Sequence, residues 1–290
     1  MKASSLKISV VLSTHPARFA AATFKGDFAA NAATIAAMGY DGIELAIREP
    51  RLVNADDLLR VLDANKLVVP AIGTGQAWGE EGLSFTDPDP EVRAAAIARL
   101  KSHFPLAARL NAASGQPGRT VVVVGLLRGI VKPGVSQDQA MAWLVDALRA
   151  CCAAAAEADV RAVLEPINRY ETTLINNLAQ GLELIKAVGA ANLGLLADTF
   201  HMNIEEPSIE GSIRAAADRI FHFHVADSNR WHPGAGHLDF ASILAALFGT
   251  GYDGFVCGEF LPIPDAETAA RRGIAHLREL RHAPDREAAK

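Results

Sequence analysis

Four polar residues of kinds that bind metal ions each close a short apolar run of the sequence. They are Glu165, Asp198, His224 and Glu259. A buried carboxylate at the end of a strand costs free energy unless a partner compensates its charge. Three carboxylates and an imidazole suit Mn²⁺, Co²⁺, Mg²⁺ or Zn²⁺, and the lack of a thiolate argues against a purely structural zinc site. The residue types therefore predict one bound divalent metal and an enzyme that uses it.

The regular spacing of these four residues strengthens the prediction. Any one of them alone could equally be an ion-paired structural group. The intervals are 33, 26 and 35 residues, from 165 to 198, from 198 to 224 and from 224 to 259. Each interval is about the length of one strand–helix unit, so the four side chains should stand side by side.

A second histidine, His222, lies on the same strand face as His224, because side chains alternate along a strand. We expect His222 one layer deeper in the fold. A hydrogen-bonded core histidine is the favoured interpretation, and a supporting role behind the site is the alternative.

Eight apolar, β-rich segments alternate with segments of helical pattern. They are nearly continuously apolar, which is typical of strands covered on both faces in a parallel sheet. The segments are residues 7–13, 42–47, 68–72, 120–126, 161–165, 193–198, 220–225 and 254–260.

The intervening segments carry residues that begin and end helices. Asn54 and Ser136 can accept hydrogen bonds as N-caps, and Pro90 fits a first helical turn. Gly39 and Gly189 fall where helices should end. These signals predict a helix in each segment where they occur.

Eight strand–helix units in series favour a single-domain (β/α)8 TIM barrel over residues 1–290, of class α/β, rather than a doubly wound sheet. The tail at about 284–290 is expected to be frayed. Active sites of such barrels lie where the strands end. The four opening residues should therefore share one arc of the rim, at strands five to eight.

The composition excludes several classes of partner. Lys and Arg total 28 against 33 for Asp and Glu, a net charge of −5, so nucleic acid is not expected. The N-terminus lacks the apolar stretch of a signal peptide, and no apolar run is long enough to span a membrane. The three cysteines form no CxxC pair, which fits a reduced compartment. We expect a cytoplasmic protein that acts on a small molecule.

Three sequence motifs resemble the ketose 3-epimerases, which include the D-tagatose, D-psicose and L-ribulose 3-epimerases of the xylose isomerase-like barrel superfamily. The motifs are residues 165–171 (EPINRYE), 195–206 (LLADTFHMNIEE) and 222–230 (HFHVADSNR). Residues 71–77 and 125–129 are more similar to a branch that acts on keto sugar acids, the 5-keto-L-gluconate (tagaturonate-forming) epimerase.

The resemblance implies a role for each matching residue. Glu165, Asp198, His224 and Glu259 would bind one metal, usually Mn²⁺ or Co²⁺, and Glu165 and Glu259 would double as the acid/base pair. Contacts with the sugar would come from Glu171, His201 and Arg230. The resemblance also implies a homo-oligomer, either a dimer or a tetramer.

The expected reaction is inversion of the carbon next to the carbonyl of a ketose or keto sugar acid. It requires removal of a weakly acidic C–H proton and its return to the opposite face, which calls for two bases. A metal on the ketone oxygen would stabilise the enediolate that forms between these steps. The alternative is an aldose–ketose isomerase, similar to hydroxypyruvate or xylose isomerase, on the same barrel. A DNA-repair endonuclease is disfavoured by the acidic charge.

Three further residues have less specific roles. His15 and Arg128 end the first and fourth strands, and we hypothesise that one or both bind a substrate carboxylate. Rim residues paired with local acids are the alternative. Trp78, in an expected loop over 75–87, could cover the site or simply pack the loop.

Overall fold

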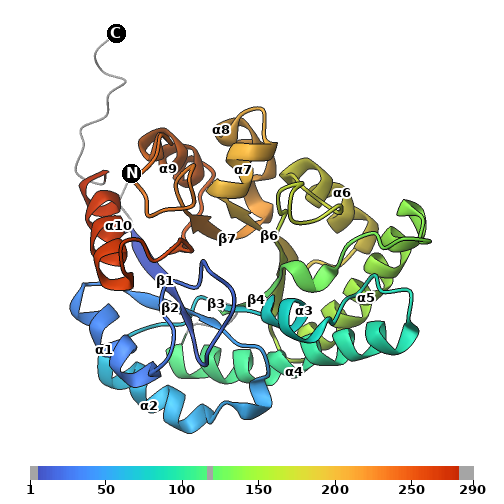
Figure 1. Ribbon diagram of the computed structural model, residues 1–290, viewed down its shortest axis with the longest axis horizontal. Helices are drawn as coiled ribbons and strands as arrows, with labels where there is room; N and C mark the ends of the chain where they lie inside the picture. The colour runs from blue at the N-terminus through green and yellow to red at the C-terminus, as the bar shows by residue number, and fades with distance from the viewer. Residues whose placement is uncertain (1–5, 116–119, 281–290) are drawn as a thin grey trace.

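The computed structural model describes residues 6–115 and 120–280. Within these ranges, eight parallel strands close into a barrel in chain order, with β8 paired to β1 (Figure 1). The strands are β1 (Lys7–Ser13), β2 (Gly42–Ala46), β3 (Ala71–Gly73), β4 (Val121–Val124), β5 (Arg161–Leu164), β6 (Leu193–Asp198), β7 (Ile220–Val225) and β8 (Phe255–Gly258). The predicted (β/α)8 barrel is therefore confirmed, while the tail at 284–290 lies outside the described residues.

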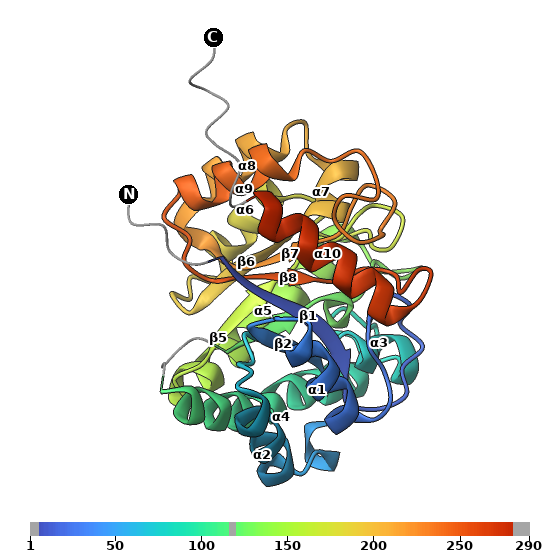
Figure 2. The same ribbon diagram turned by 90° about the vertical axis from the view of Figure 1, so that its left-hand side faces the viewer.

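Helices surround the barrel as a ring (Figure 1). They are α1 (Phe28–Ala37), α2 (Ala55–Asn65), α3 (Gln76–Glu81), α4 (Pro90–Ser114), α5 (Gln137–Glu157), α6 (Leu178–Val188), α7 (Thr199–Glu205), α8 (Ile209–Ala216), α9 (Phe240–Gly249) and α10 (Ala266–Leu280). Figure 2 shows α10 between α9 and α1, where the Tyr40 hydroxyl donates a hydrogen bond to Ala270 O. None of the helices in the described ranges is long and apolar enough to cross a membrane.

The predicted helix signals act as expected. Asn54 and Ser136 accept hydrogen bonds from the first turns of α2 and α5, and Pro90 begins α4. Gly39 and Gly189 follow α1 and α6 with φ of 88° and 75°. These left-handed values favour glycine because it has no Cβ.

Two segments differ from the sequence expectation. The strand expected at 68–72 forms only at Ala71–Gly73, since Pro70 has no N–H to donate to a neighbouring strand. The expected loop at 75–87 contains the short helix α3, which lacks a side-chain N-cap and so carried no signal in the sequence.

The two faces of the strands differ in character. Outward-facing residues such as Val10, Leu45 and Phe223 join the main hydrophobic core with the helices. Inward-facing residues form only small apolar clusters, and buried polar side chains take the remaining positions. Those polar side chains include Ser9, Ser13, Glu44, Asp198, His222 and His224. The barrel interior therefore needs internal partners for its polar groups.

One strand residue, Gly194, leaves space for an aromatic ring. A Cβ built on Gly194 would lie 2.2 Å from the ring of Phe221, so Gly194→Ala should force repacking and destabilise the fold by about 1–3 kcal/mol. Urea unfolding checks this expectation. The matched control is Gly249→Ala in α9, where a Cβ would meet nothing within 4 Å and stability should hold or rise. Equal effects of the two substitutions would contradict the packing argument.

Candidate active site

The structure brings the four expected metal ligands together at neighbouring strand ends. Asp198 ends β6 and His224 is the last residue but one of β7, while Glu165 and Glu259 directly follow β5 and β8. The backbone N–H groups of these two glutamates still donate to strand carbonyls, Glu165 to β4 and Glu259 to β7. One ligand atom from each of the four residues lies within 4.8 Å of the other three.

Asp198 and His224 each direct one unpartnered atom into this cluster. Asp198 Oδ1 accepts a hydrogen bond from Phe200 N at 2.7 Å, which caps α7 and leaves Oδ2 free. His224 Nδ1 lies 3.7 Å from Asp198 Oδ2 and 3.8 Å from Glu259 Oε2. Both Asp198 Oδ2 and His224 Nδ1 are buried without a hydrogen-bond partner among the described residues.

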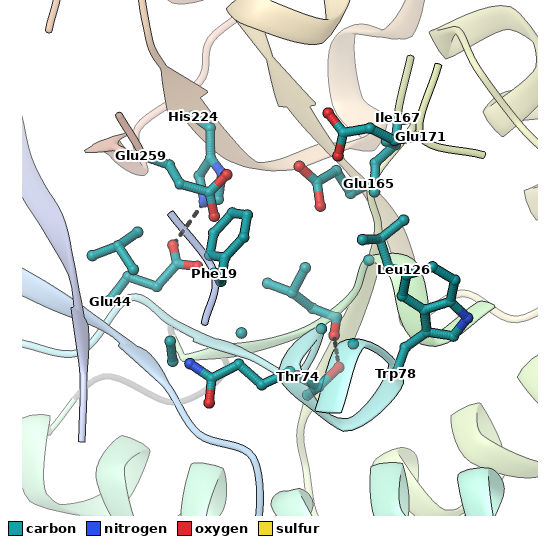
Figure 3. Close-up of a pocket in the computed structure, with 18 of the residues that line it drawn as sticks. Phe19, Glu44, Thr74, Trp78, Leu126, Glu165, Ile167, Glu171, His224 and Glu259 are labelled. Atoms are coloured by element: carbon teal, nitrogen blue, oxygen red, sulfur yellow. Dashed lines mark hydrogen bonds and ion pairs between the residues drawn. The ribbon is translucent and has the colours of Figure 1, made fainter. Parts of the chain in front are cut away.

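Glu165 and Glu259 lie on opposite sides of the cavity that opens from this cluster (Figure 3). Burial, followed by the charge of Glu259, raises the pKa of Glu165 well above its ordinary value. Burial likewise raises the pKa of Glu259 to about 7, although His224 and Arg230 act in the opposite direction. The two buried carboxylates therefore hold protons more tightly than exposed glutamates do, and a cation between them would reverse that shift.

The donor set fits a divalent metal. Two orphaned buried atoms point at the position where three carboxylates and an imidazole converge, and oxygen with nitrogen ligands suits Mn²⁺, Co²⁺, Mg²⁺ or Zn²⁺. The cluster also stabilises the protonated imidazole of His224. Burial disfavours a charge on His224, but Glu44 and Glu259 outweigh it and raise the pKa of this imidazole.

A cavity of about 270 Å³ extends from the cluster. The expected sugar contacts Glu171, His201 and Arg230 line it, and so do Phe19 and Trp78. In Figure 3, Phe19 faces the cavity, and Trp78 lies on the same side as Glu165 and Glu171. Trp78 thus forms part of the wall from α3, whose other residues along the cavity include Gln76 and Glu80.

Arg230 joins two of the carboxylates. Its guanidinium donates to Glu171 Oε1 at 3.0 Å and to Glu259 Oε2 at 3.4 Å, and it stacks over the ring of Phe200 at 4.8 Å. The loop that carries Arg230 is organised by the buried carboxylate of Asp227. That carboxylate accepts backbone hydrogen bonds from Ser228, Gly234 and Leu238.

His201 presents a defined ring nitrogen to the cavity. Its Nδ1 is 2.7 Å from the amide Nδ2 of Asn168, which also reaches Glu171 Oε1 at 2.9 Å. Because an amide NH₂ only donates, Nδ1 of His201 accepts and Nε2 carries the proton. Burial lowers the pKa of His201 to about 4, against the raising effect of Asp198, so the ring is neutral. Its Nε2–H lies 3.7 Å from Glu165 Oε1.

Two residues that organise the site were not singled out from the sequence. Asn168 lies inside the 165–171 motif and positions His201 and Glu171. Glu44 lies in β2, where it is the charged residue of an otherwise apolar strand. This charged residue within an apolar strand is the sequence signal that could have identified Glu44. Its carboxylate accepts hydrogen bonds from His222 and His224, so His222 is the buried, hydrogen-bonded histidine that was expected.

The structure does not bring the two carboxylate-binding candidates to the cavity. Arg128 is fully buried, donates to Ile175 O at 3.2 Å and is not among the lining residues. His15 lines a separate cavity of about 410 Å³ beside α2. Both residues lie just past the expected strands, but neither side chain lines this cavity. Burial lowers the pKa of Arg128 to about 10, while Glu165 and Glu171 act to raise it.

Comparison with known proteins places the chain in a family. The family model "Xylose isomerase-like TIM barrel" matches residues 32–280. The L-ribulose 3-epimerase of Methylomonas sp. (strain DH-1) is 30% identical over 250 residues, which cover 85% of this chain and 83% of that protein. The 3-dehydro-D-guloside 4-epimerase of Escherichia coli (strain K12) is 34% identical over 134 residues, which cover 46% and 51% of the two chains.

A solved structure of an L-ribulose 3-epimerase matches with a TM-score of 0.80 and 26% identity, covering 98% of this chain and 97% of the other. The shared barrel is thus accompanied by shared sequence over most of both chains. The chain therefore belongs to the xylose isomerase-like TIM barrel family and, within it, to the ketose 3-epimerases, which are isomerases.

Proposed function

We propose that the protein inverts the carbon next to the carbonyl of a ketose or keto sugar, with Glu165 and Glu259 as the two proton-transfer groups. The observation that carries this proposal is their placement on opposite sides of the cavity, both buried and both with a raised pKa. A carboxyl group with a raised pKa suits a step in which it must both take and give a proton. Two such groups on opposite faces of one carbon suffice for inversion.

One divalent ion, Mn²⁺ by preference, would be held by Glu165, Asp198, His224 and Glu259. When bound, it supplies Lewis-acid polarisation of the substrate carbonyl, which favours loss of the neighbouring proton. Hard oxygen ligands support Mn²⁺, Mg²⁺ or Co²⁺, and the single imidazole is compatible with all of them.

The remaining polar residues orient the sugar. His201 offers Nε2–H as a neutral donor to a substrate oxygen, while Asn168 fixes that orientation. Arg230 and Glu171 form one ion pair, so they can present a donor and an acceptor to adjacent hydroxyls without leaving a buried charge unpaired. The guanidinium also lies close enough to Glu259 to stabilise its ionised form after proton transfer.

Inversion at carbon three and inversion at carbon four are both compatible with this pair of groups. One relative is named as a 3-epimerase and another as a 4-epimerase of a 3-dehydro sugar, and in the second name the inverted carbon also neighbours a carbonyl. Both names describe chemistry that one pair of opposed carboxylates can perform. The competing proposal, an aldose–ketose isomerase, would move hydrogen between carbons one and two.

Reaction in D₂O tests the choice between epimerase and isomerase. With Mn²⁺ and a panel of free ketoses, 3-keto sugars and keto sugar acids, the epimerised product should carry deuterium at the inverted carbon, because solvent exchanges with the carboxylates between the two steps. NMR locates the label. An aldose product with deuterium next to its carbonyl would establish the isomerase instead.

Glutamine variants test the two-base assignment. Glu165→Gln and Glu259→Gln should each reduce epimerisation by about 10²–10⁴-fold. At saturating Mn²⁺, each variant should still exchange the proton of one epimer, the one that faces the remaining carboxylate. Glu183→Gln, at an exposed position of α6, is the matched control and should retain full activity. Epimerisation that survives in both active-site variants would contradict the assignment.

Metal affinity should rise with pH. Because the pKa of Glu259 is raised to about 7 and that of Glu165 is also raised, protons occupy the ligands at low pH and a metal must displace them. The increase in melting temperature on adding Mn²⁺ should therefore be larger at about pH 8 than at about pH 6. Calorimetry in buffers of different ionisation enthalpy should detect proton release on binding. A shift independent of pH would count against these carboxylates as ligands.

A further inference from the structure

We propose that Glu44 is a positioning residue that fixes the ring of His224, so that Nδ1 faces the metal and Nε2 keeps its proton. The proposal rests on the proposed function, since it assigns Glu44 a role toward the metal of that site. Glu44 is the buried acid of β2 and does not belong to the four ligands. Its effect would be on metal affinity rather than on the proton-transfer steps.

A single carboxylate oxygen holds both histidines of β7. Glu44 Oε2 lies 2.8 Å from His222 Nε2 and 2.8 Å from His224 Nε2. Glu44 is 2% exposed and both histidines are 1% exposed. The dashed line in Figure 3 marks the contact between Glu44 and His224. The hydrogen bonds are therefore shielded from water, which strengthens them.

This contact determines which nitrogen of His224 can bind a metal. An ionised carboxylate only accepts hydrogen bonds, so the nitrogen that faces Glu44 must carry a hydrogen. In the neutral imidazole the lone pair is then on Nδ1. That atom is the buried, unpartnered one that lies 3.7 Å from Asp198 Oδ2 and 3.8 Å from Glu259 Oε2. Glu44 therefore directs Nδ1 toward the metal position, and a metal that binds there displaces any proton that Nδ1 holds.

His222 completes the arrangement by fixing the carboxylate. Its ring lies edge-on to that of His224, with centroids 5.1 Å apart and an interplanar angle of 79°. The second hydrogen bond restricts rotation of the Glu44 carboxylate. Since β2 and β7 are separated by β1 and β8 in the barrel, Glu44 braces His224 from across the barrel interior.

The same atoms admit a second interpretation, in which Glu44, His222, His224 and Cys257 bind a further metal, since their ligand atoms lie within 4.8 Å of one another. The hydrogen bonds favour the positioning role. Glu44 Oε2 already accepts from both histidines at 2.8 Å, so a metal at this position would have to displace the protons of both Nε2 atoms. The number of metal ions bound per chain separates the two interpretations.

Metal binding without any sugar tests the proposal. Glu44→Ala should weaken Mn²⁺ binding by about 10–100-fold in calorimetric or chelator-competition titrations. Glu44→Gln should retain most of the affinity, because an amide oxygen in place of Oε2 can still accept from both histidines. Activity of Glu44→Ala should recover at saturating Mn²⁺, since the proton-transfer groups are intact.

The matched control is Glu49→Gln, which removes another buried carboxylate shortly after β2. Glu49 pairs with Arg51 and Arg99 and contacts none of the four ligands, so Mn²⁺ affinity should be unchanged. Unaltered affinity in Glu44→Ala would overturn the proposal, and so would two metal ions per wild-type chain. If the wild-type chain binds no metal, the proposed function fails as well, whereas loss of the Glu44 effect alone leaves that function standing.

The wild-type protein offers a test that does not depend on a variant folding. In protein labelled with ¹⁵N at histidine and loaded with diamagnetic Zn²⁺, NMR should show His224 with a slowly exchanging Nε2–H and with the metal on Nδ1. Metal on Nε2, or a rapidly exchanging Nε2–H, would overturn the role of Glu44.

Discussion

Repulsion among buried carboxylates is the constraint that organises this molecule. Glu165, Asp198 and Glu259 converge within a few ångströms, and Glu44 and Glu171 lie close behind them. Two buried guanidinium groups, Arg128 and Arg230, offset only part of this negative charge. A closed barrel can hold such a cluster because its strands are fixed by hydrogen bonds and by a continuous outer core. The strands thus hold the carboxylates together despite their mutual repulsion, and a cation bound among them would relieve that repulsion.

The fold was predictable because its signals are local. Buried parallel strands read as apolar runs, and caps such as Asn54 and Ser136 use their own side chains. The four strand-end residues were predictable as a group because each interrupts an apolar run at a similar interval. The barrel then brings together residues that are far apart in the chain. No further long-range contact has to be known to predict that these strands are parallel.

Other parts depend on contacts that no local pattern encodes. Glu44 and His224 are 180 residues apart, and only barrel closure shows that they touch. Arg128 ends the short helical turn Leu126–Arg128, and its side chain is fully buried without lining the cavity. Helix α3 lacks a capping side chain, and its place in the cavity wall follows from packing. Side-chain direction after a strand is thus less predictable than strand position.

The position of helix α7 limits how the sugar site of this enzyme can vary. Asp198 caps the helix and His201 lies in its first turn, so a candidate metal ligand and a candidate sugar contact move as one rigid unit. A substitution that shifts α7 would therefore displace Asp198 and His201 at once. Helix α3 contributes Gln76 and Trp78 to another part of the wall and bears none of the four ligands. Natural variation in sugar preference should therefore accumulate on α3, where shape can change while the ion-binding cluster is preserved.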